Sequence, residues 1–130
     1  MISAHAFIAV VDDEPPVRVM LRRLLVLADF RVGVYATGED FLASLNVRQP
    51  VCAIVDLEMP GLSGFEVLAR VRFAKVEVPV VFITASDEAA LDRAALAAGG
   101  KCLLRKPFSG DELLTAIAIA TGMLPPKPPP

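Results

Sequence analysis

The sequence predicts an α/β fold in which a parallel sheet is covered by helices on both faces. Four short apolar runs recur along the chain, and continuous runs of this length are typical of strands buried on both sides. Segments with helical spacing of apolar residues separate them, and an alternating segment, Arg31–Tyr35, adds an edge strand. Five such alternations, joined by right-handed crossovers, indicate a flavodoxin-like (βα)5 three-layer sandwich with strand order 2-1-3-4-5. The four apolar runs are residues 7–11, 51–55, 80–83 and 102–104.

Start and stop signals bound the expected helices. Ser63 with Glu66, and Ser109 with Glu112, match the capping box, in which each side chain binds the backbone N–H of the other residue. Gly99 ends the fourth helix, because glycine readily adopts the left-handed conformation found at helix C-termini. We therefore expect helices over residues 15–28, 38–45, 63–73, 88–98 and 109–120.

Length and composition limit the class of protein. The 130 residues fit one domain of net charge −2 without a basic stripe, so this domain alone is not expected to bind nucleic acid. No apolar stretch is long enough to span a membrane, and residues 1–6 lack a basic region followed by an apolar core, so we expect neither a membrane span nor a signal peptide. Cys52 and Cys102 fall in predicted strands, which indicates reduced thiols in a cytoplasmic protein. We expect the domain over residues 1–122 and a proline-rich tail or linker over 123–130.

Five polar residues stand at the ends of the predicted strands: Asp12, Asp13, Asp56, Thr84 and Lys106. In an open parallel sheet, ligands bind outside the carboxyl ends of the strands, so these side chains should converge. Two like charges about 4 Å apart repel by about 4 kcal/mol at an effective dielectric constant of about 20. Three carboxylates around one crevice therefore favour a bound cation. Mg²⁺ (or Mn²⁺) fits, because Mg²⁺ binds one or two carboxylates and leaves positions for phosphate oxygens.

Lys106 supplies the opposite charge at this edge. Its ammonium group suits a carboxylate or phosphate oxygen, and we expect a cis Lys106–Pro107 bond that aims the side chain back over the crevice. Each signal also has a plainer interpretation, since an acidic turn can simply cap a helix and a lysine can lie in a surface turn. The ordered spacing of all these residues favours a phosphoryl site.

With these motifs, the chain resembles the receiver domains of two-component response regulators over residues 6–122. It is most similar to the nitrogen-fixation-regulator subgroup, whose receivers usually precede a helix-turn-helix output domain. The resemblance implies a signalling phospho-acceptor rather than an enzyme, with a sensor histidine kinase as partner. The motifs that carry it are VVDDE (10–14), VDLEMPG (55–61), ITA (83–85) and KPF (106–108).

The resemblance implies a role for each matching charged position. Asp56 would be the phospho-acceptor. Asp12, Asp13, Asp56 and the backbone carbonyl of Glu58 would hold the Mg²⁺ ion, with Asp12 acting largely through water. Lys106 would pair with Asp56 at rest and with the phosphoryl group afterwards.

The resemblance also implies roles for the residues that respond to the phosphoryl group. Thr84 would donate its hydroxyl to that group, and the small Ala85 would keep the site accessible. Glu58 and Ser86 would modulate dephosphorylation. Leu103 stands where the family usually carries Tyr or Phe, so this position departs from the usual aromatic switch.

Glu58 is the second departure. It lies two residues past the expected phospho-acceptor, where the water for dephosphorylation must pass. Its charge is expected either to change the lifetime of the aspartyl phosphate or to pair with Lys106 in the resting state.

Two other functions compete with this one. A haloacid-dehalogenase-like phosphatase also uses an aspartate nucleophile at a strand end, but it requires Asp-x-Asp, and here Glu58 stands two residues after Asp56. A pseudo-receiver, which binds partners without phosphorylation, usually lacks the acidic pair, the phospho-acceptor or the lysine. All of these are present, and Leu103 is the feature that best supports a pseudo-receiver.

The fifth expected helix is apolar around more of its circumference than packing on a sheet requires. We therefore expect part of it, including Ile119, to be exposed. Exposed apolar surface often marks an interface. The face formed by the fourth helix, the fifth strand and the fifth helix is the expected output surface and the site of a possible homodimer.

Overall fold

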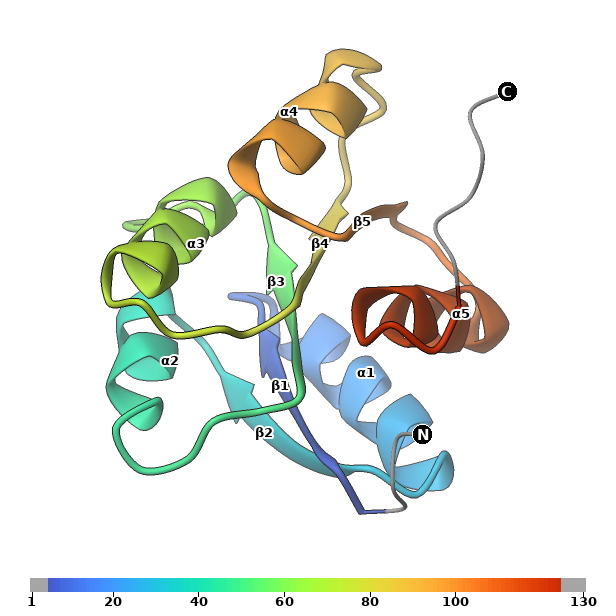
Figure 1. Cartoon of the computed structure of the whole chain (residues 1–130). Helices are drawn as coiled ribbons and strands as arrows, with labels where there is room; N and C mark the ends of the chain where they lie inside the picture. Colours follow the sequence, from blue (N-terminus) through green and yellow to red (C-terminus); the bar gives the residue numbers. More distant parts are fainter. Residues whose placement is uncertain (1–4, 125–130) are drawn as a thin grey trace.

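The computed structural model describes residues 5–124, which form a five-stranded parallel sheet between two layers of helices (Figure 1). This architecture confirms the predicted flavodoxin-like fold. In chain order, the elements are β1 (Phe7–Val11), α1 (Pro15–Leu27), β2 (Arg31–Tyr35), α2 (Gly38–Ser44), β3 (Cys52–Asp56), α3 (Gly64–Phe73), β4 (Val80–Thr84), α4 (Ala90–Ala98), β5 (Cys102–Arg105) and α5 (Gly110–Ala120).

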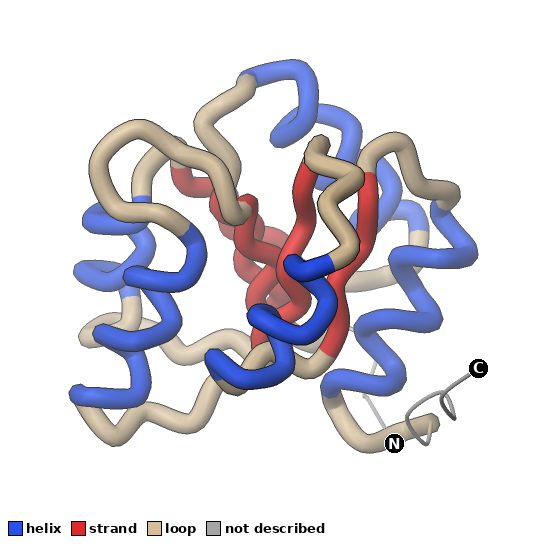
Figure 2. The backbone as a smooth tube through the Cα atoms, turned by 90° about the horizontal axis from the view of Figure 1, so that it is seen from above, coloured by secondary structure: helices blue, strands red, loops and turns tan. Residues whose placement is uncertain are grey.

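The strands lie in the order β2-β1-β3-β4-β5, as predicted, and every neighbouring pair is parallel. Figure 2 shows the strands in the middle of the molecule with helices on both sides. The chain reverses its direction of travel across the sheet between β1 and β3, so the carboxyl ends of these strands form the switch point. The register places Asp56 beside Ile83 and Thr84 beside Arg105.

Two hydrophobic cores lie on opposite faces of the sheet, because successive strand residues point to opposite sides. In β1, Ala9 and Val11 belong to the core with α2, α3 and α4, whereas Ile8 and Val10 belong to the core with α1 and α5. Leu21 of α1 is completely buried. Full burial of such a side chain contributes about 1.5–3 kcal/mol, so these cores fix the strands and with them the loops at the strand ends.

Most element bounds agree with the predicted ones to within one residue. β3 and β4 run one residue further than expected, so Asp56 and Thr84 end their strands instead of following them. The expected start of the fourth helix at residue 88 was wrong, because α4 begins at Ala90. Glu88 lies in the preceding loop, where its N–H donates to Ser86 Oγ at 3.2 Å.

Both predicted capping boxes are present. Ser63 Oγ accepts the N–H of Glu66 at 3.2 Å, and the Glu66 carboxylate accepts the N–H of Ser63 at 3.1 Å. Ser109 and Glu112 make the same pair of bonds at the start of α5. Each box satisfies two N–H groups that a helix start leaves without intrahelical partners. The helices that follow β3 and β5 therefore begin at defined residues.

Within the described part of the chain, no helix is both long and apolar enough to cross a bilayer. Cys52 and Cys102 form no disulfide bond, and Cys52 is buried. Burial raises the pKa of the Cys52 thiol to about 12, so it stays protonated at neutral pH. Of the predicted tail, residues 125–130 lie outside the described residues.

Candidate functional site

Four carboxylates from two strand ends gather in one crevice at the switch point. Asp12, Asp13 and Glu14 follow β1, and Asp56 ends β3. One carboxylate oxygen of each lies within 4.8 Å of the others. Asp12 is completely buried and Asp56 is 2% exposed, whereas Asp13 is half-buried and Glu14 is exposed. The structure thus brings the three predicted aspartates together and adds Glu14.

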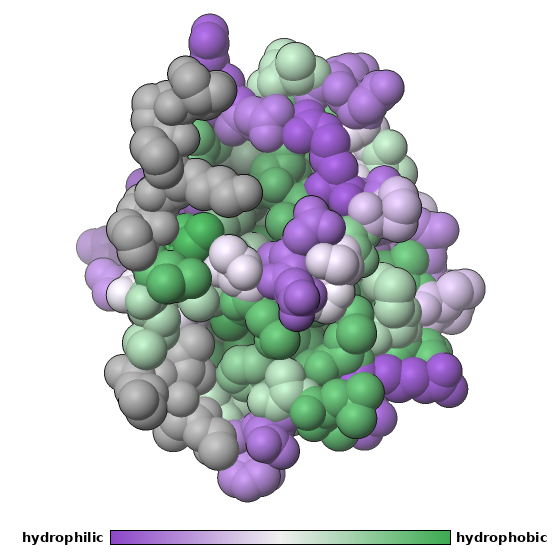
Figure 3. All heavy atoms as spheres, turned by 90° about the vertical axis from the view of Figure 1, so that its right-hand side faces the viewer, coloured by the Kyte–Doolittle hydropathy of each residue, from purple (hydrophilic) through white to green (hydrophobic). Residues whose placement is uncertain are grey.

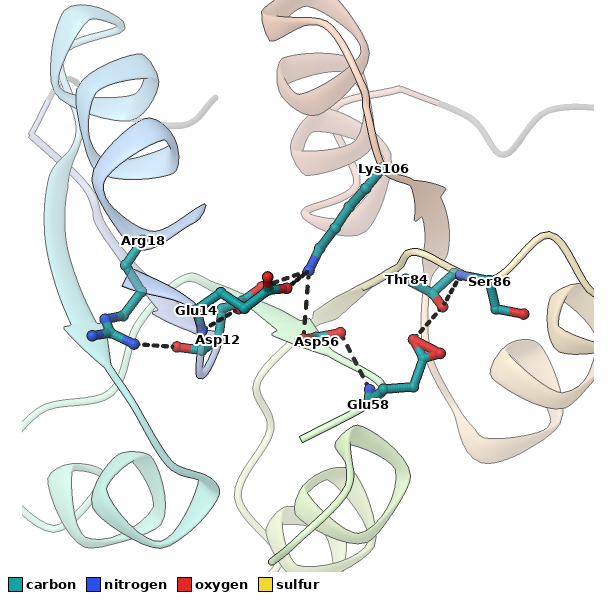
Figure 4. A network of polar contacts seen from close by, with 8 residues as sticks. All are labelled: Asp12, Glu14, Arg18, Asp56, Glu58, Thr84, Ser86 and Lys106. Carbon is teal, nitrogen blue, oxygen red and sulfur yellow. Dashed lines mark hydrogen bonds and ion pairs between the residues drawn. The ribbon is translucent and has the colours of Figure 1, made fainter. Parts of the chain in front are cut away.

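A tight turn holds the first of these carboxylates in place. Asp12 Oδ1 accepts the N–H of Glu14 at 2.8 Å, and Arg18 Nη1 donates to the Asp12 carbonyl oxygen at 2.8 Å (Figure 4). The N–H of Asp12 donates to the carbonyl of Tyr35 at 3.1 Å, which ties the turn to β2. The acidic turn is therefore fixed before any ligand binds.

The start of α3 is pressed against the end of β3. A Cβ atom on Gly64 would lie 2.5 Å from the carbonyl oxygen of Asp56 and 2.9 Å from Cα of Leu57, so only glycine fits here. The N–H of Gly64 donates to the carbonyl of Leu57 at 3.0 Å. This contact fixes the backbone that carries the Asp56 carboxylate.

Lys106 lies among the carboxylates (Figure 4). Its Nζ is 3.0 Å from Asp12 Oδ2, 3.4 Å from Glu14 Oε1 and 3.5 Å from Asp56 Oδ2. The contact with Asp12 is an ion pair whose carboxylate is completely buried. The Lys106–Pro107 bond is cis, as predicted. The expected alternative, a resting pair between Lys106 and Glu58, is not found.

Burial and charge shift the proton affinities at this site. Burial raises the pKa of Asp56 to about 6, and the Asp12 charge adds to the rise, while Lys106 and the N–H of Glu58 oppose it. For Lys106, burial lowers the pKa, but its contact with Asp12 and the charge of Asp56 outweigh burial, so the net shift is upward. At neutral pH the site therefore holds an ionised Asp56 beside a charged lysine.

The Thr84 hydroxyl is bound by Glu58 rather than by Asp56. Thr84 is completely buried, and its Oγ1 donates to Glu58 Oε1 at 2.5 Å while accepting the N–H of Ser86 at 3.0 Å. The N–H of Glu58 in turn donates to Asp56 Oδ1 at 3.2 Å. Figure 4 shows these contacts running from Asp56 to Ser86. Ala85 follows Thr84 and is exposed, so the chain leaves this side of the crevice open.

Sequence reasoning gave Glu14 no role beyond its place in the acidic VVDDE motif, and in the structure it contacts Lys106. Arg105 was missed altogether, and it binds the loop that follows Thr84 and the first turn of α4. No motif marks Arg105. Its position beside Thr84 in the parallel register was the signal that could have found it. Leu103 is half-buried and packs against the core that contains α4.

The profile of the response regulator receiver domain matches residues 8–118. The chain belongs to the response regulator receiver domain family. The predicted family resemblance is thereby confirmed, and the crevice described above is the acidic end of a receiver domain, a signalling domain.

Relatives of known identity agree with this assignment. The receiver domain is 36% identical over 124 residues to the transcriptional regulatory protein TcrA of Mycobacterium tuberculosis, covering 94% of this chain and 49% of TcrA. It is 34% identical over 113 residues to the transcriptional regulatory protein FixJ of Rhizobium meliloti, covering 86% of this chain and 55% of FixJ. The chain therefore spans about half the length of these relatives.

Solved structures show the same fold. The crystal structure of FixJ-N superposes with a TM-score of 0.85 at 31% identity, covering 95% of this chain and 98% of that one. A response regulator receiver protein from Burkholderia phymatum superposes with a TM-score of 0.80 at 39% identity, covering 90% of this chain and 95% of the other.

The face of this receiver domain formed by α4, β5 and α5 carries a hollow whose lining is mostly apolar but includes Lys101, Asp111 and Glu112. Figure 3 shows apolar atoms gathered on the side of the molecule that carries α5. A hollow of about 450 Å³ lies there, and Leu96, Leu104, Ala116 and Ile119 are among its lining residues. Ile119 is half-buried, so the expectation that it is exposed was wrong, because it turns into this hollow. Leu114, at 37% exposure, is the exposed large apolar residue of α5.

Proposed function

We propose that this receiver domain accepts a phosphoryl group on Asp56 from the phosphohistidine of a sensor histidine kinase, in a Mg²⁺-dependent reaction. The observation that carries the proposal is a buried carboxylate with a lysine ammonium 3.5 Å away, at the switch point of a parallel sheet. Positioning and charge neutralisation supply most of the catalysis in phosphoryl transfer, and this crevice offers both.

Asp56 is the nucleophile in this proposal. One of its carboxylate oxygens forms a bond to phosphorus, and the bond from phosphorus to the imidazole nitrogen of the donor breaks, leaving the electron pair on that nitrogen. A pKa of about 6 leaves Asp56 largely ionised at neutral pH, as a nucleophile must be. The raised pKa also means that its charge is poorly satisfied at rest, which favours reaction.

Lys106 and Thr84 stabilise the transferred group. Lys106 pairs with the phosphoryl oxygens in place of the Asp56 carboxylate, and the Thr84 hydroxyl leaves Glu58 to donate to another phosphoryl oxygen. Exposed Ala85 leaves room for the donor. Glu58 and Ser86, which both bind the Thr84 hydroxyl at rest, are placed to modulate hydrolysis of the aspartyl phosphate.

The donor atoms of the crevice fit a small, hard divalent cation. Asp12, Asp13 and Asp56 offer oxygen ligands only, and Asp12 Oδ2 is buried without a hydrogen bond. These three residues and the backbone carbonyl of Glu58 would hold Mg²⁺. When bound, the ion neutralises charge on the phosphoryl oxygens.

We further propose that phosphorylation changes partner binding or self-association through the α4–β5–α5 face. Its hollow and the exposed Leu114 support this proposal, since exposed apolar area often marks an interface. Sedimentation with and without beryllofluoride, for the native chain and for Leu114→Glu, tests it. A response to beryllofluoride that Leu114→Glu abolishes is the expected result. An unchanged sedimentation and partner affinity in every sample would place the output surface elsewhere.

The phosphorylation site itself is tested by mass. The protein is incubated with acetyl phosphate and Mg²⁺, and its intact mass is measured. We expect one phosphate adduct on the native chain and none on Asp56→Asn. An adduct that persists on Asp56→Asn would contradict the assignment of the site. A native chain that takes up no phosphate would instead favour a pseudo-receiver.

A further inference from the structure

The loop between β4 and α4, residues 85–89, connects the candidate phosphorylation site to α4. At its first end, the N–H of Ser86 donates to Thr84 Oγ1 at 3.0 Å. The Thr84 hydroxyl is at the same time bound by Glu58. Any change in the position of the Thr84 side chain therefore acts directly on the backbone of this loop.

Arg105, the last residue of β5, makes side-chain contacts with this loop from outside it. Its Nε donates to the carbonyl of Ser86 at 3.2 Å, and its Nη2 donates to the carbonyl of Glu88 at 2.6 Å. The guanidinium also forms a two-point ion pair with Asp92 in the first turn of α4, with both N–O distances 3.1 Å. One side chain thus joins the loop, the strand and the helix.

This arrangement depends on the shape of the guanidinium group. The ion pair is partly exposed, with the Arg105 and Asp92 side chains 33% and 57% accessible, so charge alone contributes little to stability. A planar fork with several fixed donors can nevertheless hold three acceptors in one geometry. The group is therefore suited to transmitting position rather than to adding stability.

A continuous series of polar contacts results, from Thr84 through Ser86 and Arg105 to Asp92. From β5, the Arg105 side chain donates two hydrogen bonds to backbone carbonyls of this loop. Leu103, which stands where the family usually has an aromatic residue, offers no polar atom for such a link. Arg105 therefore provides a side-chain route from the Thr84 loop to β5 and α4, beside the backbone contacts of the loop with the start of α4.

We propose that Arg105 is the positioning residue that carries a displacement of Thr84 to α4. The inference rests on the proposed function, in which Thr84 leaves Glu58 for the phosphoryl group. When Thr84 moves, Ser86 follows it, and the guanidinium moves Asp92 and the start of α4 with the loop. Without Arg105, the site still responds, but the helix does not follow.

The test measures amide chemical shifts on addition of beryllofluoride with Mg²⁺. Arg105→Met keeps an unbranched side chain and removes all its donors. Arg93→Met is the matched control, because Arg93 is the neighbour of Asp92, is exposed and makes no hydrogen bond or ion pair with the described residues. In Arg105→Met we expect the Thr84 amide to shift as in the native chain, while the shifts of the α4 amides fall by at least half. Arg93→Met should respond fully.

Each outcome decides between defined alternatives. If the α4 amides of Arg105→Met shift as much as those of the native chain, the role of Arg105 is overturned and the proposed function remains intact. A native chain whose Thr84 amide does not respond would overturn the proposed function, and this inference with it. Should Arg105→Met fail to fold, Asp92→Asn provides the same test, since it weakens the last contact of the series and keeps the loop contacts.

Discussion

The carboxylates of the crevice differ in how well their charge is satisfied. Lys106 neutralises part of the cluster, and its Nζ lies nearer to Asp12 than to Asp56. Burial chiefly raises the pKa of Asp56 to about 6, the Asp12 charge adds to the rise, and Lys106 opposes it only in part. An ionised group in such an environment favours any partner that removes its charge, whether a proton, a cation or a phosphoryl group. The same property that suits Asp56 for the proposed reaction makes it a local source of instability.

Asp56→Asn should stabilise the protein at neutral pH when a chelator removes divalent cations. A carboxyl group whose pKa is higher in the folded state binds more protons in that state than in the unfolded state. Its contribution to the free energy of unfolding therefore falls as the pH rises from about 4 to about 6, and it is constant above that range. The variant should gain about 1–3 kcal/mol in free energy of unfolding at pH 8, and the gain should vanish near pH 4. Urea unfolding at the two pH values measures this. An equal gain in the free energy of unfolding at pH 4 and pH 8 would show that ionisation of Asp56 is not its cause.

Glu58→Gln should tighten beryllofluoride binding about three- to tenfold in the presence of Mg²⁺. The Glu58 carboxylate competes with the phosphoryl analogue for the Thr84 hydroxyl, and a neutral amide is the weaker acceptor. Because the substitution also removes a charge, the same change is measured in a Thr84→Ala background by isothermal titration calorimetry. The effect should shrink there. An equal gain in both backgrounds would show that charge, and not the hydrogen bond, is responsible.

At the scale of elements, the site depends on where two helices begin. α3 and α5 both start with a serine capping box followed by glycine, yet the two glycines have different surroundings. Gly64 abuts the backbone of Asp56, whereas a Cβ on Gly110 would lie 3.3 Å from the flexible end of Leu24. The same local sequence pattern therefore serves two purposes, one of which holds the site.

Gly64→Ala should destabilise the protein by about 1–3 kcal/mol, because backbone atoms at 2.5 Å and 2.9 Å from the new Cβ cannot move aside without shifting the end of β3. Phosphorylation by acetyl phosphate should slow as well. Gly110→Ala is the matched control and should change stability by less than about 1 kcal/mol. Urea unfolding and phosphorylation rates measure both effects. Equal behaviour of the two variants would contradict the contact with Asp56.

At the scale of the whole molecule, the sheet separates two cores and presents its carboxyl edge between them. The acidic crevice lies at the switch point, and the α4–β5–α5 face lies at the β5 edge of the same sheet, where α4 and α5 pack on opposite faces (Figure 1). Ligand binding at that edge therefore acts on elements from both cores. We expect ligand binding to change the free energy of unfolding of the whole domain.

Mg²⁺ should raise the free energy of unfolding by about 1.4 kcal/mol at ten times its Kd, as expected for a ligand that binds the folded state alone. Asp13→Asn should lose most of this gain, because it removes a carboxylate of the crevice. Asp111→Asn, which removes an exposed carboxylate from α5, is the control and should keep the gain. Thermal unfolding at increasing Mg²⁺ concentrations checks this. An unchanged response of Asp13→Asn would remove Asp13 from the cation site.

Local patterns were sufficient to predict the elements, their order in the sheet and the edge where the site lies. Apolar runs, capping boxes and Gly99 determine the structure of residues close to them in the sequence. The parallel arrangement of the strands then brings Asp12, Asp56 and Lys106 to one edge of the sheet. The predicted start of α4 was wrong because the Ser86 side chain binds the backbone of the loop before the helix. No apolar pattern in the sequence marks this contact.

Only the tertiary structure shows which side chains contact one another. Thr84 with Glu58, the three carboxylates around Lys106 and the contacts of Arg105 all join residues far apart in the chain. Which atoms meet depends on the direction in which each side chain leaves its element, and neighbouring elements set that direction. Ile119 shows the same effect, since the hollow beside β5 and not the pattern of α5 determines its exposure.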